Sequence, residues 1–99
     1  GIGDAPAQAR LTLGNHPNPF NPRTTVSFTL SESGPVTLAI YDLSGARVDL
    51  LADRVYPAGA HAVSWDGRDA NGLPLPSGIY LARAVTGTAV QTRRMTLVR

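Results

Sequence analysis

The chain has 99 residues, of which 42% are hydrophobic and 16% charged, with a formal net charge of +2. This length allows one domain with a single core, and the apolar content is too high for a disordered chain. No cysteine occurs, which excludes disulfides, thiolate metal sites and a thiol nucleophile. The basic residues are all arginine and are scattered among aspartates, so we expect no nucleic-acid partner.

The first nine residues are small and polar and include Gly1, Gly3 and Pro6. This composition is typical of a linker, so we expect residues 1–9 to be a linker tail and residues 10–99 to be the domain. The apolar runs are far shorter than the roughly 20 residues of a membrane-spanning helix, and no signal-peptide pattern opens the chain. We therefore expect no transmembrane segment in these residues.

Apolar and polar residues alternate along the rest of the chain, which is the period of a β-strand. The expected strands are Leu11–Leu13, Val26–Leu30, Val36–Ile40, Arg47–Leu51, His61–Trp65, Ile79–Val85 and Val90–Val98. No window shows apolar residues at helical spacing over three turns, and Gly or Pro interrupts most stretches long enough for a helix. The sequence predicts an all-β fold, an immunoglobulin-like or fibronectin III-like antiparallel sandwich of about seven or eight strands. The expected core contains Phe28, Leu38, Ile40, Val63, Trp65, Tyr80 and Leu97.

A proline-rich stretch at residues 15–22 is the first candidate for function. Its X-Pro steps favour extended backbone and predict a stiff loop. In one interpretation, Phe20 closes the end of the sandwich while the asparagines satisfy the loop's own backbone groups. In the other, the loop is a docking site for a partner. The residue pattern alone favours the first interpretation.

The stretch from Trp65 to Gly78 is the second candidate, because Asp66, Asp69 and Asn71 carry oxygens that could bind calcium. Arg68 and Ala70 occupy two ligand positions of a calcium loop, so a tight turn in which the aspartates accept backbone N–H bonds is the favoured interpretation. We expect no cofactor. The histidines, His16 and His61, lack an obvious third ligand for a metal.

No catalytic motif is present. A nucleophile elbow, a zinc-binding HExxH helix, a phosphate-binding glycine loop and a dinucleotide fingerprint are all absent from the sequence. Glu32 is the only glutamate, and a small sandwich offers little concave surface for two opposed carboxylates. We therefore expect a protein that is not an enzyme.

The C-terminal stretch, residues 92–99, alternates apolar with polar or basic residues and is the third candidate. Arg93, Arg94 and Arg99 could protect an edge strand from random sheet pairing. Alternatively, a partner could bind this strand by strand addition or through acidic groups. The chemistry of the residues favours edge protection.

From His16 to Arg99 the chain resembles the C-terminal sorting domains of the bacterial type IX secretion system. The resemblance rests on HPNPFNPRT at 16–24, VTLAIYDLSG at 36–45, AGAH at 58–61, WDG at 65–67, SGIY at 77–80 and RRMTL at 93–97. His16 stands where the family usually has Tyr. The central WDG to SGIY section is equally similar to the immunoglobulin-like domain of flagellar hook-capping proteins (FlgD), and the two ends of the chain favour the sorting family.

The resemblance to sorting domains implies a module that directs an upstream cargo protein from the periplasm of a Gram-negative-type bacterium to the cell surface or the medium. The implied partners are the upstream cargo domain, the outer-membrane type IX translocon and a sortase-like peptidase. The residues that the resemblance implies for partner recognition are Asn18, Pro19, Phe20, Asn21, Arg93, Arg94, Met95, Leu97 and Arg99.

Three other functions remain open at this stage. The first is a structural or oligomerising immunoglobulin-like module, as in the hook-capping proteins, which would use an exposed strand edge. The others are a carbohydrate-binding module for an upstream hydrolase, which would need exposed aromatic rings, and a calcium-stabilised spacer. In isolation we expect a monomer.

Overall fold

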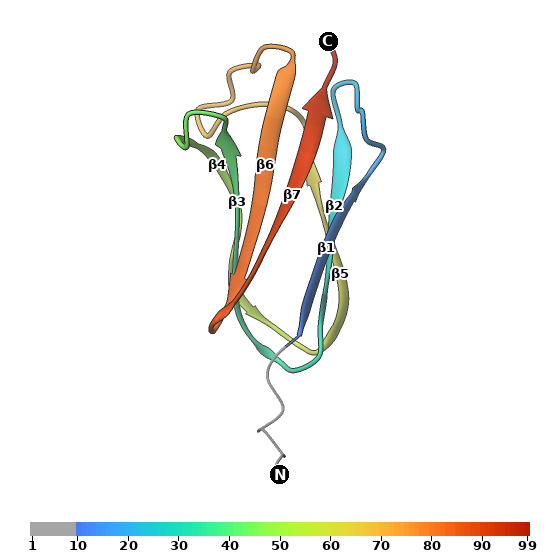
Figure 1. Ribbon diagram of the computed structural model, residues 1–99, viewed down its shortest axis with the longest axis vertical. Coiled ribbons are helices and arrows are strands. Elements are labelled where there is room, and N and C mark those ends of the chain that lie inside the picture. Colours follow the sequence, from blue (N-terminus) through green and yellow to red (C-terminus); the bar gives the residue numbers. More distant parts are fainter. Residues whose placement is uncertain (1–9) are drawn as a thin grey trace.

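The computed structural model describes residues 10–99, and the linker expected at residues 1–9 lies outside the described residues. The described part contains β-strands and no helix (Figure 1). No segment of it could therefore cross a membrane as a helix. The strands are β1 (Leu11–His16), β2 (Thr24–Leu30), β3 (Gly34–Asp42), β4 (Arg47–Tyr56), β5 (Gly59–Trp65), β6 (Gly78–Thr86) and β7 (Ala89–Leu97). The all-β prediction is confirmed.

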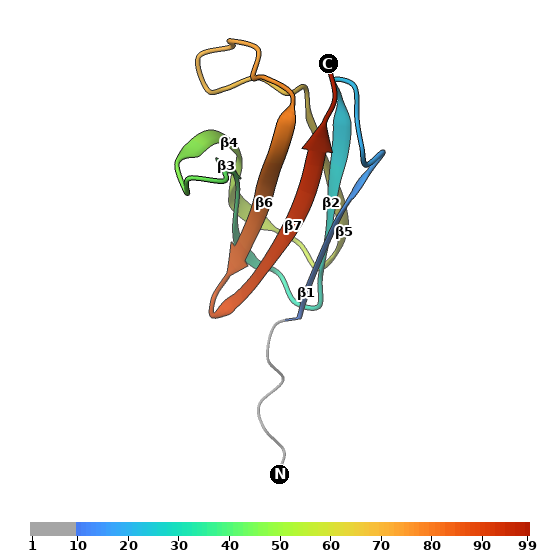
Figure 2. The ribbon, with the colours of Figure 1, turned by 45° about the horizontal axis from the view of Figure 1, so that its top comes forward.

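The strands form two antiparallel sheets that face each other as a sandwich (Figures 1 and 2). One sheet has the order β1-β2-β5 and the other the order β4-β3-β6-β7. The fourth strand pairs with β3, whereas in a constant-type immunoglobulin domain it joins the first sheet. The arrangement is therefore the fibronectin III-like one, and β1, β5, β4 and β7 are edge strands.

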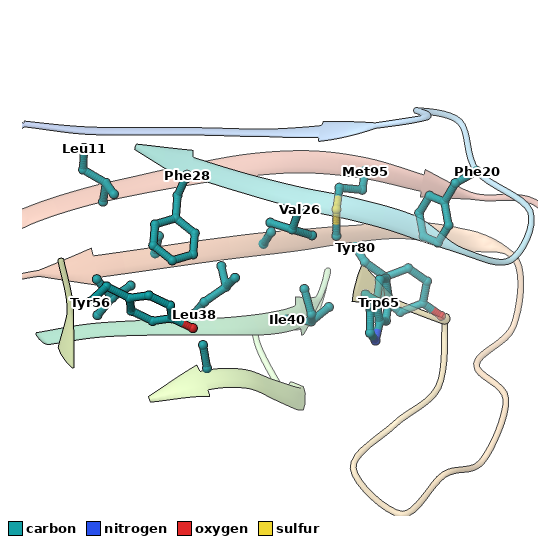
Figure 3. Packing of buried hydrophobic residues seen from close by; sticks show 14 of the residues in the cluster. Leu11, Phe20, Val26, Phe28, Leu38, Ile40, Tyr56, Trp65, Tyr80 and Met95 are labelled. Carbon is teal, nitrogen blue, oxygen red and sulfur yellow. The ribbon is translucent and has the colours of Figure 1, made fainter. Parts of the chain in front are cut away.

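The core lies between the sheets and is built by strict alternation, since every second residue of β2 is buried. Figure 3 shows Phe20, Trp65 and Tyr80 at one end of this core and Phe28 with Tyr56 at the other. The expected core residues are buried, with one exception. Val63 is only partly buried, because it lies in β5, an edge strand with a neighbouring strand on one side only.

The fourth strand differs from the prediction, which ended it at Leu51. It continues to Tyr56 and carries two bulges. Opposite β3, the register passes from Ala52 directly to Leu50 and from Asp49 directly to Arg47, so Leu51 and Val48 have no partner. Both unpaired side chains turn inward and pack against the core. A period-two pattern cannot follow such a strand, because each bulge exchanges the two faces.

Two tight turns follow from their residues. Gly87 has a φ of 56° at the first position of the two-residue β6–β7 turn, which identifies a type II′ hairpin. Between β3 and β4, the Asp42 carboxylate accepts hydrogen bonds from the Ser44 hydroxyl at 2.5 Å and from the N–H groups of Ser44 and Ala46. The Ser44 hydroxyl is the main reason why the pKa of Asp42 is lowered.

Candidate functional site: the proline-rich loop bound to the last strand

The proline-rich loop and the C-terminal strand, which are the two ends of the sorting-domain resemblance, lie side by side. The Phe20 N–H donates to the Thr96 carbonyl and the Val98 N–H donates to the Phe20 carbonyl, both at 2.9 Å. These bonds form a parallel bridge between Phe20 and Leu97. The loop therefore covers the free edge of β7 where that strand ends. We call residues 17–23 and 94–99 together the loop–strand unit.

The side chain of Asn18 extends this pairing. Its Nδ2 donates to the Arg94 carbonyl at 3.1 Å, and its Oδ1 accepts from the Thr96 N–H at 3.0 Å. The amide thus takes the place of a backbone peptide group beside β7. The interpretation in which the asparagines serve the loop's own backbone is wrong for Asn18. It holds for Asn15, whose Nδ2 donates to the Pro17 carbonyl at 3.3 Å.

A second network holds the base of the loop. The buried Thr24 hydroxyl donates to the Pro17 carbonyl at 2.8 Å and accepts from Asn15 Nδ2 at 3.1 Å. The Oδ1 of Asn15 in turn accepts from Arg93 Nε at 2.8 Å, which connects β1 with β7. Neither Thr24 nor Asn15 is among the residues that the resemblance implies for partner recognition. A threonine that opens a strand directly after a proline-rich loop could have indicated this role, because such hydroxyls often bind nearby carbonyls.

Arg99 joins the loop–strand unit to the β5–β6 connection, residues 66–77. Its guanidinium donates to the carbonyls of Gly67, at 2.6 Å, and Leu75. Its backbone N–H donates to the Ser77 hydroxyl at 2.8 Å. Gly67 has a φ of 72° and is buried against the carbonyl of Pro22. Three segments distant in the sequence therefore meet at this end of the sandwich (Figure 1).

The structure divides the residues expected to recognise a partner into three groups. Phe20, Met95 and Leu97 are buried in the core, so their side chains are not available to a partner of the folded domain, and this part of the expectation needs correction. They are apolar residues of the sandwich interior, as the simpler interpretation of Phe20 held. The side chains of Asn18, Arg93 and Arg99 are engaged in the hydrogen bonds described above. Of these three, Asn18 and Arg99 are nevertheless exposed. The remaining members, Pro19, Asn21 and Arg94, are exposed and lie outside these side-chain hydrogen bonds.

The candidate calcium residues serve the β5–β6 connection instead. Asp69 Oδ1 accepts from the N–H groups of Asn71 and Leu73, both at 2.9 Å. Asp66 forms an ion pair with Arg68 at 3.6 Å, and within residues 10–99 its carboxylate accepts no backbone N–H bond of the expected kind. Within residues 10–99, no three His, Cys, Asp or Glu side chains are grouped closely enough to hold a metal ion.

The histidines are separated by the sheet. His16 pairs with Thr25 on the outer face of the three-stranded sheet, and His61 pairs with Phe28 on its inner face. His61 packs between the rings of Phe28 and Tyr56, with centroid distances of 5.3 and 4.8 Å. The fold therefore does not bring the two imidazoles together.

Tyr80 closes the core next to this end. Tyr80 lies near the start of β6, and its hydroxyl donates to the carbonyl of Pro76, four residues upstream, at 2.8 Å. Its ring packs on Trp65 with a centroid distance of 5.6 Å, and the Trp65 indole N–H donates to the Arg68 carbonyl at 3.1 Å. Burial, followed by the negative charge of Asp42, raises the pKa of Tyr80 above its usual value of 10.0.

This pKa shift predicts a loss of stability in alkaline solution. A folded-state pKa above the unfolded value means that Tyr80 contributes its stability below pH 10.0 and loses it as the pH rises through the folded pKa. Urea unfolding at increasing alkaline pH is expected to show this loss. Tyr80→Phe should reduce the slope and cost about 0.5–1.5 kcal/mol near neutral pH for the lost hydrogen bond. Tyr41→Phe is the matched control, and an equal effect of both variants would contradict the assignment to Tyr80.

Two facing antiparallel sheets, with a tyrosine bonded across the β5–β6 corner, define an immunoglobulin-like β-sandwich domain. Residues 14–89 match the sequence profile of the FlgD Ig-like domain. The chain belongs to this family. A search of curated proteins finds no match.

Solved structures of the same fold include parts of two large bacterial proteins. The crystal structure of dimeric latent PorU from Porphyromonas gingivalis matches 96% of this chain with a TM-score of 0.77 and 20% identity. PorZ, described as an essential surface component of the type IX secretion system of the same bacterium, matches 88% with a TM-score of 0.58 and 21% identity. This chain spans 10% of the first protein and 11% of the second. At this identity the similarity concerns the fold.

Proposed function

We propose that this domain is a non-catalytic sorting module that directs a cargo protein in the same chain through the type IX secretion system. In this role the cargo reaches the periplasm, and the translocon in the outer membrane recognises the folded domain. The product then reaches the cell surface or the medium, where a sortase-like peptidase acts on the junction. The module itself requires no cofactor.

The observation that carries this function is the joining of the proline-rich loop to the last strand. These segments bear the two sequence features most typical of sorting domains, and they form one hydrogen-bonded unit. The unit presents Pro19, Asn21 and Arg94 to solvent on a rigid support. The occurrence of the same fold in PorU and in PorZ, a component of that secretion system, agrees with this role.

A reporter experiment tests the proposal. A periplasmic reporter fused to residues 1–99 is produced in a host with a type IX translocon, and the reporter is measured in the medium, on the surface and in the periplasm. Asn21→Ala with Arg23→Ala removes exposed loop side chains, so the fusion should stay folded but remain in the periplasm. Arg10→Ala with Ser33→Ala is the matched control at the opposite end of the sandwich and should be exported.

The outcomes separate the possibilities. Export of the loop variant at the parent level would contradict recognition through the loop. Removal of residues 90–99 is a poor test, because Met95 and Leu97 belong to the core and the fusion would unfold. A fusion to the host's own sorting domain verifies that the reporter can be exported.

The match to the FlgD Ig-like domain supports a second candidate, a structural module of an extracellular assembly. The β5 edge fits this use, since its sequence, GAHAVSW, carries neither a charged residue nor a proline to block strand addition. Retention of the folded parent fusion in the periplasm, combined with a molecular mass that rises with protein concentration, would favour this candidate.

A further inference from the structure

The outer face of the four-stranded sheet carries a group of arginines, of which the proposed sorting function uses only Arg94. Because side chains alternate along a strand, the residues between the core positions point outward. The cross-strand register places Arg47, Tyr41, Leu81 and Arg94 in one row across β4, β3, β6 and β7. The next row is Leu50, Ala39, Arg83 and Thr92. We call these two rows the arginine face.

The charge of this face is unbalanced. Arg47, Arg83 and Arg94 are exposed, and none of them forms an ion pair within residues 10–99. The row beyond Leu50 and Ala39 contains an acid, Asp53, which accepts a hydrogen bond from the Thr37 hydroxyl at 3.4 Å. By the same alternation, the outer face of the other sheet bears no charged side chain. Its residues are Thr12, Gly14, His16, Thr25, Ser27, Thr29, Ala60, Ala62 and Ser64.

The arginine face is also hollowed. A shallow depression of about 430 Å³ is lined by Tyr41, Gly45, Leu81, Arg83, Val90 and Thr92. Ala39, which has the smallest side chain in the two rows, is 2% exposed. Leu50 and Val90 remain 39% and 46% exposed at the margins. The apolar side chains of Leu81 and Val90 thus line the depression together with the guanidinium group of Arg83.

These features indicate the chemistry of an occupant. Guanidinium groups bind carboxylates with two parallel hydrogen bonds, and aliphatic side chains are covered best by other apolar groups. A carbohydrate would require aromatic platforms and side-chain amides or acids, whereas this face offers a single aromatic ring and no such group in either row. Adjacent strands lie about 4.8 Å apart, so the arginines are distributed across the sheet and suit an extended ligand.

We propose that the arginine face docks an extended segment of a partner protein in which every second residue faces the sheet, and in which these facing residues are acidic and apolar in turn. The carboxylates pair with Arg83 and its neighbours, and the apolar side chains cover Leu81 and Val90. This inference does not depend on export, because the loop variants proposed above leave Arg83 intact. Either proposal can therefore fail without the other.

The test is a titration of the 99-residue chain, observed by ¹⁵N–¹H correlation spectra, with the blocked peptide Glu-Ser-Leu-Ser-Glu-Ser-Leu, in which the Glu and Leu side chains share one face of the extended chain. The expected result is a set of saturable shifts at Ala39, Leu81, Arg83 and Thr92 that weakens with added salt. Arg83→Gln should weaken binding about tenfold, as the loss of a charge-assisted hydrogen bond does. Arg10→Gln makes the same change of charge outside the face and should leave the affinity unchanged.

Several results would overturn the proposal. These are the absence of shifts, shifts confined to the loop or to the β5 edge, or equal weakening by Arg83→Gln and Arg10→Gln, which would mean unspecific attraction. The peptide Lys-Ser-Leu-Ser-Lys-Ser-Leu should not bind, and binding by it would contradict charge complementarity. Polygalacturonate is the carbohydrate probe, and tighter binding of it at the same residues would assign the face to an acidic glycan.

Discussion

Replacement of Phe20 by alanine is expected to lower the free energy of unfolding by about 3–5 kcal/mol. The side chain is 2% exposed and packs on Trp65 with a centroid distance of 5.5 Å. Its removal leaves a cavity at the end of the core and weakens the support of the loop. Because the backbone of Phe20 binds Thr96 and Val98, the variant should also speed hydrogen exchange at the Val98 amide.

Urea unfolding and native-state hydrogen exchange measure these two effects. Asn21→Ala is the neighbouring control, since that side chain is exposed and its loss should change stability by less than about 0.5 kcal/mol. If Phe20→Ala fails to fold, Phe20→Leu provides a milder test of the same contact. Equal stability of the Phe20 and Asn21 variants would show that the loop does not close the core.

Gly67→Ala is expected to cost about 2–5 kcal/mol for two separable reasons. The residue has a φ of 72°, where an L-amino acid pays about 1–2 kcal/mol. In addition, an added Cβ would lie 3.0 Å from the Pro22 carbonyl oxygen and 3.1 Å from Arg99 Nη2. The Pro22 oxygen belongs to the backbone, so it can move away from the added Cβ only if the loop moves with it.

A second glycine in the same connection separates the two reasons. Gly72 has a similar φ of 80°, but a Cβ added there would meet no atom within 4 Å. Gly72→Ala should therefore cost only the conformational part. The difference between the two variants in thermal and urea unfolding measures the crowding at Gly67. Equal losses of stability would mean that the three segments adjust to the methyl group without cost.

The sandwich was predictable because alternation survives wherever one face of a strand is buried. β2 is the clearest case, and the core positions of β3, β6 and β7 follow the same rule. The rule fails in β4, where the bulges at Val48 and Leu51 reverse the alternation. β4 belongs to the four-stranded sheet because it pairs with β3. The local sequence pattern of β4 does not specify that pairing.

The candidate site was predictable in composition and not in geometry. The sequence indicated that both the loop and the last strand matter, but the pairing of Asn18 with Arg94 and Thr96 joins residues more than seventy positions apart. Apart from the Asn18 amide, the hydrogen bonds between the loop and β7 join backbone groups, which are present in every residue type except for the N–H that proline lacks. The residue pattern favoured a buried Phe20, but it did not reveal that Met95 lies inside or that Pro19 and Asn21 lie outside.

The pairing of an early loop with the final strand affects how the molecule forms during synthesis. A nascent chain that ends before Met95 lacks two core side chains, Met95 and Leu97, and also the backbone partners of the loop. The ordered loop can exist only after the ribosome has completed β7. A receptor that binds the ordered loop would consequently reject unfinished or clipped molecules and act as a proofreading step on whatever protein is fused to the domain.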